Sequence, residues 1–110
     1  MDNYENSQDD SSDVKKAKVK LTAKSLKKKV KLSWKLTGTK VDSYEIYRAK
    51  VKKGKYVKVR TVKKSGATGY TYLKKLNQGK TYFYKVRGVK TIDVQKYYTK
   101  WSNIAKAKNK

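Results

Sequence analysis

The sequence predicts an all-β sandwich of seven antiparallel strands, and three observations support this. From Lys18 onward apolar and polar residues alternate, which is the pattern of strands with one buried and one solvated face. Turn signals recur every 8–15 residues. No segment shows the apolar spacing of a helix, and β-branched and aromatic residues occupy many of the alternating positions.

The first two predicted strands follow this alternation closely. In residues 18–22, Val19 and Leu21 alternate with lysine and threonine. A lysine-rich turn leads to residues 29–36, where every second side chain is apolar and Trp34 is the largest. Each of these strands should therefore bury one face and expose a lysine-rich face.

The third and fourth predicted strands are separated by a basic turn. The third begins after the glycine-containing turn at residues 37–40 and covers residues 44–49, with Tyr44 and Ile46 in the inward phase. The fourth covers residues 56–62 and is rich in valine. A basic turn between two β-prone segments is typical of a hairpin.

The last three predicted strands lie beyond the loop at residues 65–69. A short strand is headed by Tyr70 and Tyr72, and a turn at residues 77–79 then leads to a long strand over residues 80–91. A final strand is expected from residue 97 to 108. The inward phase of the long strand holds Tyr82, Tyr84, Val86 and Gly88.

Charge is distributed very unevenly along the 110 residues, which carry a formal net charge of +23. Residues 1–14 hold five acidic residues and no basic one, whereas all 31 basic residues lie after them. The acidic, polar start predicts a disordered tail or linker over residues 1–16, followed by one domain over residues 17–110. All but three of the basic residues are lysines, which favour a diffuse polyanion surface over base-specific recognition.

Four motifs, in order, resemble the fibronectin type III family over residues 17–109. Residues 30–34 are similar to its strand B, residues 41–48 to strand C, residues 76–86 to the tyrosine corner and strand F, and residues 100–103 to the start of strand G. The match is closest to a lysine- and tyrosine-rich subtype of Gram-positive bacterial surface and secreted proteins. The resemblance implies an immunoglobulin-like sandwich with Trp34, Tyr44, Ile46, Tyr70, Leu76, Tyr82, Tyr84 and Val86 in the core.

The residue inventory offers little for catalysis. The chain has no cysteine or histidine, which removes thiol chemistry and the commonest zinc ligands. Gly79-Lys80-Thr81 is not a phosphate-binding loop, because the glycine required five positions earlier is replaced by Lys74. We therefore expect no enzyme, no cofactor and no metal site, and no apolar run has the ~18 residues of a membrane span.

A candidate ligand surface follows from the aromatic residues that fall outside the inward phase. Tyr47 and Phe83 lie on outward phases of adjacent strands, and a further aromatic cluster is found near Trp101. These rings could bind sugars, or they could be covered by lysine methylene stems. With the nearby basic residues, the candidate surface comprises Tyr47, Phe83, Arg87, Tyr97, Tyr98, Lys52, Lys53 and Lys55.

The leading functional interpretation is a non-catalytic module of a bacterial extracellular or cell-wall protein. We expect a monomeric spacer between neighbouring domains of a longer chain, whose signal peptide lies outside this sequence, with electrostatic affinity for anionic cell-wall polymers or polysaccharides. One alternative is a carbohydrate-binding accessory module of a glycan-active enzyme. A less favoured alternative is a β-sheet nucleic-acid-binding domain that uses Tyr47, Phe83 and Arg87.

Overall fold

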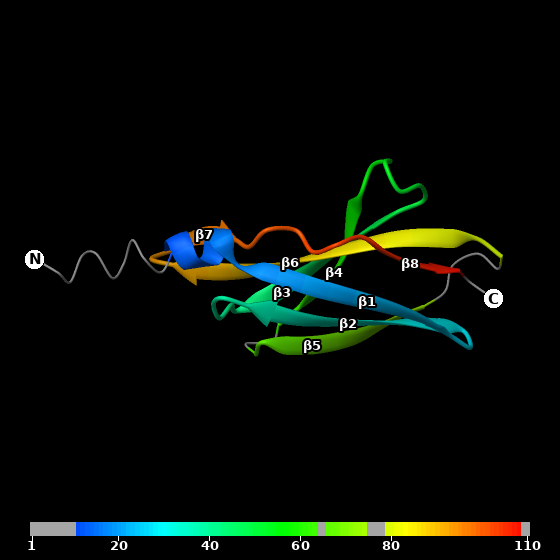
Figure 1. Cartoon of the computed structure of the whole chain (residues 1–110), viewed down its shortest axis with the longest axis horizontal. Coiled ribbons are helices and arrows are strands. Elements are labelled where there is room, and N and C mark those ends of the chain that lie inside the picture. Colours follow the sequence, from blue (N-terminus) through cyan, green and yellow to red (C-terminus); the bar gives the residue numbers. More distant parts are fainter. Residues whose placement is uncertain (1–10, 64–65, 75–78, 109–110) are drawn as a thin grey trace, which may run out of the picture.

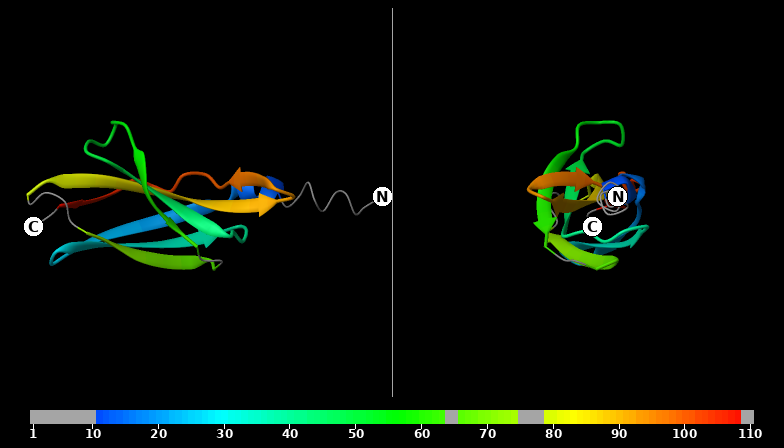
Figure 2. Two further views of the ribbon diagram at one scale, coloured as in Figure 1. Left: turned by 180° about the vertical axis from the view of Figure 1, so that it is seen from behind. Right: turned by 90° about the vertical axis from the view of Figure 1, so that its left-hand side faces the viewer.

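The computed structural model describes residues 11–63, 66–74 and 79–108, which form two facing antiparallel sheets (Figures 1 and 2). One sheet has the strand order β1-β2-β5, and the other has the order β4-β3-β6-β7 with β8 also paired to β6. This architecture confirms the predicted all-β sandwich. The strands are β1 (Lys18–Leu26), β2 (Lys29–Thr37), β3 (Ser43–Ala49), β4 (Val57–Val62), β5 (Thr68–Lys74), β6 (Thr81–Ile92), β7 (Gln95–Tyr98) and β8 (Ala105–Lys108).

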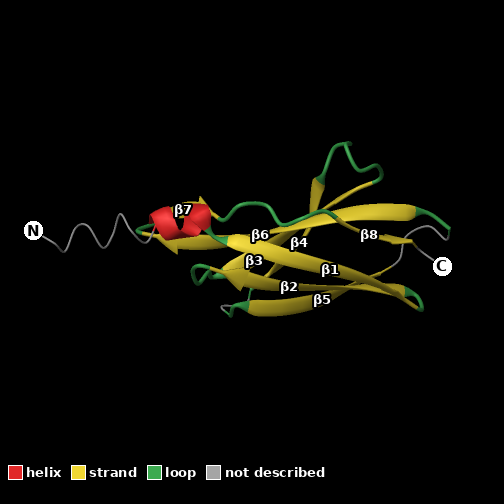
Figure 3. Ribbon diagram, in the orientation of Figure 1, coloured by secondary structure: helices red, strands yellow, loops and turns green. Residues whose placement is uncertain are grey.

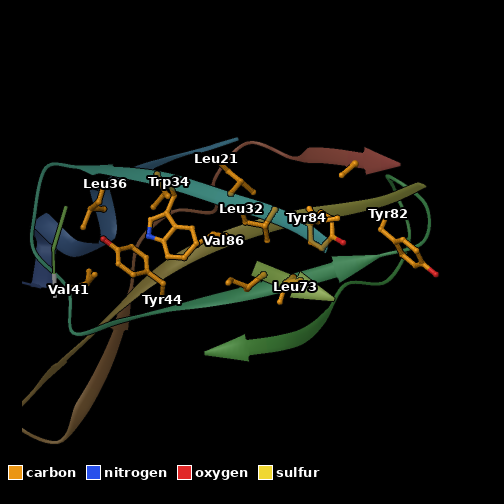
Figure 4. Close-up of a cluster of buried hydrophobic side chains, with 14 of the residues drawn as sticks. Leu21, Leu32, Trp34, Leu36, Val41, Tyr44, Leu73, Tyr82, Tyr84 and Val86 are labelled. Carbon is orange, nitrogen blue, oxygen red and sulfur yellow. The ribbon is translucent and has the colours of Figure 1, made fainter. Parts of the chain in front are cut away.

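Alternate side chains of both sheets meet in one hydrophobic core (Figure 4). The Trp34 and Tyr44 rings pack against each other with centroids 5.1 Å apart. Leu32 and Val86 are also completely buried between the layers. Trp34, Tyr44, Ile46, Tyr82, Tyr84 and Val86, all expected in the core, are buried, whereas Leu76 lies outside the described residues.

Two of the core tyrosines, Tyr44 and Tyr84, remain neutral. The Tyr44 hydroxyl donates to the Gly66 carbonyl at 2.5 Å. Burial raises the pKa of the Tyr44 and Tyr84 hydroxyls above the ordinary value. Both therefore stay protonated at neutral pH and bring no charge into the core. The resemblance to the fibronectin type III family implies a tyrosine-corner hydrogen bond from the start of β6 back to the preceding turn. Residues 75–78 of that turn lie outside the described residues, so this bond stays a prediction.

The predicted final strand over residues 97–108 is wrong in one respect, because it is divided into β7 and β8. Between them, the backbone ladder against β6 is kept in one direction only: the Thr99 and Ser102 N–H groups donate to the Gly88 and Val86 carbonyls at 3.0 and 2.8 Å, while the return bonds go to side-chain hydroxyls. The Gly88 N–H donates to the Thr99 hydroxyl at 2.8 Å, and the Val86 N–H donates to the Ser102 hydroxyl at 2.9 Å. Residues 99–104 thus follow β6 without forming a strand, which gives eight strands within the described ranges instead of the predicted seven.

A short helix over residues 11–16 corrects the expectation of an unstructured segment up to residue 16 (Figure 3). Val14 on this helix is fully buried, and its carbonyl accepts a hydrogen bond from the Ala17 N–H at 3.2 Å. The Lys100 N–H in turn donates to the Ala17 carbonyl at 3.2 Å. The ordered domain therefore begins before residue 17, and the acidic residues 1–10 lie outside the described part. No helix in the described ranges is long and apolar enough to cross a bilayer.

The assignment of Tyr70 to the core is also wrong, because β5 has the opposite phase. Gly69, Thr71 and Leu73 face inward, and the Tyr70 side chain is 55% exposed. Gly69 pairs with Trp34 across the sheet, and a Cβ at position 69 would approach the indole nitrogen to 2.6 Å. The large indole thus requires the glycine opposite it, and this pairing turns Tyr70 and Tyr72 toward solvent.

Candidate functional site

The outer face of the larger sheet carries alternating rings and cations, which we call the aromatic–cation cluster. The Arg87 guanidinium carbon lies 3.9 Å from the Tyr98 ring centre and 4.6 Å from the Trp101 ring centre. The Lys85 ammonium nitrogen lies 4.1 Å from the Trp101 ring centre. Cations therefore already occupy ring faces that a ligand would use. The cluster consists of Tyr47, Tyr56, Lys85, Arg87, Tyr98 and Trp101.

The nearly buried carboxylate of Glu45 holds this cluster in place through Arg87. Glu45 is 7% exposed, and its Oε1 accepts a hydrogen bond from Arg87 Nε at 2.8 Å. Its Oε2 lies 3.6 Å from the Lys58 ammonium nitrogen. The Arg87 Nη2 also donates to the Tyr47 hydroxyl at 3.4 Å. Because Arg87 is held by a carboxylate and stacked by rings, the cluster is best explained as part of the fold's internal support.

The structure places most of the remaining residues of the predicted ligand surface away from this cluster. Tyr97 precedes Tyr98 on β7 and so points to the other side of the sheet, where the Lys15 ammonium nitrogen lies 5.6 Å from its ring centre. Phe83 is the exception: it is half-buried on β6 in the same outward phase as Lys85, and it lies opposite Ala49 of β3 and Lys106 of β8. The loop between β3 and β4 projects away from both sheets (Figure 1) and carries Lys52, Lys53 and Lys55.

A different surface, the outer face of the β1-β2-β5 sheet, concentrates positive charge, and we call it the basic face. No acidic or arginine residue occurs in these three strands. Across the β1–β2 pair, Lys20 lies opposite Lys35 and Lys24 opposite Lys31, so like charges are direct neighbours. Its outward-phase lysines are Lys18, Lys20, Lys24, Lys29, Lys31, Lys35 and Lys74.

Two exposed tyrosines complete the basic face at its β5 edge. Tyr72 is 41% exposed, and its ring lies edge-on to Tyr70 with centroids 5.8 Å apart. The Lys29 ammonium nitrogen lies 4.5 Å from the Tyr72 ring centre, and that of Lys31 lies 5.1 Å from the Tyr70 ring centre. Arg60 of β4 donates to the Tyr72 carbonyl at 2.8 Å, which tethers the β5 edge to the other sheet.

At the opposite edge, a shallow groove of about 630 Å³ extends the basic face past β1. Lys18, Lys20, Lys35 and Lys100 line it, together with Trp101, which is 37% exposed. The side chain of Asn103 holds the groove wall in place: its Oδ1 accepts from the Leu21 N–H at 2.8 Å, and its Nδ2 donates to the Leu21 carbonyl at 2.9 Å. The Asn103 side-chain amide thus forms with the Leu21 backbone the two hydrogen bonds that a neighbouring strand would form.

Sequence reasoning missed the basic face because Tyr70, one of its two tyrosines, was assigned to the core. One signal was available: Leu73 is the apolar residue that follows Tyr70 and Tyr72, and placing it inward forces both tyrosines outward. The signal for the lysines was the strict alternation in β1 and β2. Sequence alone could not show that the two strands lie beside β5, which brings lysines and tyrosines onto one surface.

The described residues offer no metal site and no catalytic carboxylate pair. No three residues of the types His, Cys, Asp and Glu in this part of the chain lie close enough to hold a metal ion. Glu45 is held in its ion pairs, and the Asp42 Oδ2 accepts a hydrogen bond from the Thr91 N–H at 2.8 Å.

The chain is similar in structure to parts of larger carbohydrate-active enzymes, while no protein-family model and no curated protein sequence matches it. Pectate lyase Pel3 from Pectobacterium carotovorum matches with a TM-score of 0.63 and 19% identity, over 86% of this chain and 27% of that chain. A β-1,2-glucanase from Parabacteroides distasonis matches with a TM-score of 0.60 and 21% identity, over 82% of this chain and 12% of that chain. Pectate lyase PelI from Erwinia chrysanthemi, solved with tetragalacturonic acid, matches with a TM-score of 0.58 and 18% identity, over 82% of this chain and 27% of that chain. At these identities the likeness shows the fold alone, and this chain spans only a minor part of each enzyme.

Proposed function

We propose that this chain is a non-catalytic, fibronectin type III-like module of a longer bacterial extracellular or cell-wall protein. It acts as a rigid spacer between neighbouring domains and binds anionic polymers through surface lysines. The strand order β1-β2-β5 against β4-β3-β6-β7 supports a module of this type. The structural neighbours are longer chains of which this fold is a small part, which supports an accessory position.

The basic face is the observation that carries the binding part of this proposal. Seven lysines share one face of three strands that contain no acidic residue, so their charges are not neutralised within the sheet. Direct like-charge neighbours across strands destabilise a sheet, and an anionic polymer laid over them would relieve that repulsion. The binding is expected to be driven by release of counterions from the polymer, with affinity set by charge density.

A second candidate, a carbohydrate-binding accessory module, draws on a separate observation. The structural neighbours are a β-1,2-glucanase and two pectate lyases, one of them bound to an acidic oligosaccharide. The two candidates overlap if the polymer is itself an acidic polysaccharide. The predicted ligand residues Tyr47 and Arg87 contribute less to either candidate, because both are held in the aromatic–cation cluster.

Two charge-matched pairs of variants test the binding surface. Lys29→Gln with Lys31→Gln removes two charges from the basic face, and Lys52→Gln with Lys53→Gln removes two from the projecting loop. We expect the first pair to weaken binding to immobilised polygalacturonate about tenfold at low salt, and the second by about twofold or less. Retention on the polymer, with thermal melting to verify folding, provides the measurement.

Two outcomes contradict the proposal. If the unaltered chain does not bind polygalacturonate or polyphosphate at low salt, polyanion binding is not its function. If both pairs of variants weaken binding equally, the attraction comes from overall charge, and the basic face has no special part in it.

A further inference from the structure

The basic face has a feature that bulk charge does not explain, namely two tyrosines placed outward beside each other on β5. We propose that this face binds a linear acidic polysaccharide, with sugar rings lying on Tyr70 and Tyr72 and sugar carboxylates paired with Lys29 and Lys31. This inference rests on the proposed function and names both the polymer class and the contact residues. It predicts recognition of the sugar ring in addition to its charge.

The exposure of the tyrosine pair is unusual for an edge strand. Edge strands are normally protected by charged or polar residues, and the outward positions at both ends of β5 follow this rule with Thr68 and Lys74. Between them, Tyr70 and Tyr72 are 55% and 41% exposed and form an aromatic step on the surface. Large, rigid and amphipathic rings of this kind supply contact area at low conformational cost, which suits a binding surface.

The lysines beside the rings are placed for carboxylates. The Lys29 ammonium nitrogen lies 4.5 Å from the Tyr72 ring centre, and the Lys31 ammonium nitrogen lies 5.8 Å from the same centre. A sugar ring seated on Tyr72 would therefore hold its carboxylate within reach of both ammonium groups. A uronic acid residue combines the apolar ring face and the negative charge that this arrangement requires.

The contrast with the aromatic–cation cluster strengthens this assignment. There Glu45 holds Arg87 in place, so the cation cannot leave its rings without breaking an ion pair. On the basic face, the strands that carry Lys29 and Lys31 contain no carboxylate, and exposed lysine side chains reorient readily. A ligand can therefore displace these ammonium groups from the rings and pair with them.

A path for the polymer continues from the tyrosines across the sheet. Ser33 lies opposite Tyr70, and the Lys20–Lys35 pair follows in the next row toward the edge groove. Crossing from β5 to β1 covers two strand spacings, about 10 Å. The groove, lined by Lys18, Lys20, Lys35 and Lys100, then offers further positive charge along the same path. This arrangement suits an extended polymer better than a single sugar.

Polyphosphate and single-stranded nucleic acid fit the surface less well. Polyphosphate has no ring to lie on Tyr70 or Tyr72. The three strands contain no arginine, the residue that pairs bidentately with phosphate and stacks on bases. A sugar ring that carries a carboxylate can contact both the exposed tyrosine rings and the lysine ammonium groups of the basic face.

The test uses a double variant that combines Tyr70→Thr and Tyr72→Thr, and a control variant, Tyr97→Thr. Both are made in the full 110-residue chain. Threonine keeps a β-prone residue at each position, and Tyr97 is also a strand tyrosine beside a lysine. Dissociation constants are measured for polygalacturonate, polyphosphate and a single-stranded oligonucleotide at one salt concentration. We expect the double variant to bind polygalacturonate about tenfold more weakly and polyphosphate with unchanged affinity, and the control to match the unaltered chain.

Three results would overturn the inference. Equal losses for polygalacturonate and polyphosphate would show that the tyrosines serve folding or charge placement only. A larger loss for the oligonucleotide than for polygalacturonate would assign the rings to nucleotide bases. Unchanged binding of all three polymers would remove the tyrosines from the site while leaving the proposed function intact.

Discussion

Replacement of Glu45 by alanine is expected to lower the free energy of unfolding by about 3 kcal/mol, because it leaves Arg87 without its nearly buried partner. The carboxylate is 7% exposed and also faces the Lys58 ammonium group. Its loss would free the guanidinium that stacks on Tyr98 and Trp101. Urea unfolding followed by Trp fluorescence measures the change.

Asp42→Ala is the matched control for this prediction. Its carboxylate also accepts a hydrogen bond across the larger sheet, from the Thr91 N–H, but it forms an exposed contact. We expect its loss to cost about 1 kcal/mol. Combining Glu45→Ala with Arg87→Met should recover part of the stability, since no buried charge is then left unpaired. Equal effects of Glu45→Ala and Asp42→Ala would contradict the assignment of the cluster to internal support.

The second large effect concerns salt. If about four lysines neutralise charges on a bound polymer, raising monovalent salt from about 50 to about 200 mM should weaken binding about 100-fold. The basic face and its edge groove together present enough lysines for this number of contacts. Isothermal titration with polygalacturonate at several salt concentrations gives the slope directly.

A neutral polymer is the control for the salt experiment. Dextran lacks charge, so we expect it to bind weakly and with little dependence on salt. A dissociation constant for polygalacturonate that stays constant across the salt range would exclude counterion release as the driving force. It would also favour the sugar rings alone as the recognised feature.

Much of the architecture could be predicted because period-two alternation directly reports a half-buried strand. Trp34 in β2 and Tyr44 in β3 fall on the inward phase of clear alternating patterns, and both are buried. The division of the final strand could not be predicted in this way. It depends on Thr99 and Ser102 hydroxyls that accept hydrogen bonds from β6, and this pairing requires knowledge of the partner strand.

The candidate site was predicted less well, because a surface combines strands that are distant in sequence. Tyr97 and Tyr98 are adjacent in sequence and were grouped together, yet adjacent strand residues point to opposite sides, and they lie near different cations. Tyr70 was assigned to the core by resemblance. In the structure, the Trp34 indole leaves room only for a glycine at position 69, so Gly69 faces inward and Tyr70 faces outward. The lysine alternation in β1 and β2 was visible in the sequence, but its position beside β5 was not.

Mapping the contact surface by NMR is the most direct test of whether the basic face binds the acidic polysaccharide. Amide signals of the labelled chain are followed while a short oligogalacturonate is added at low salt. We predict that the largest shifts occur in β1, β2 and β5, above all at Lys31, Tyr70 and Tyr72. Shifts centred on Tyr47, Phe83 and Arg87, or spread evenly over all lysines, would contradict the assignment of binding to the basic face.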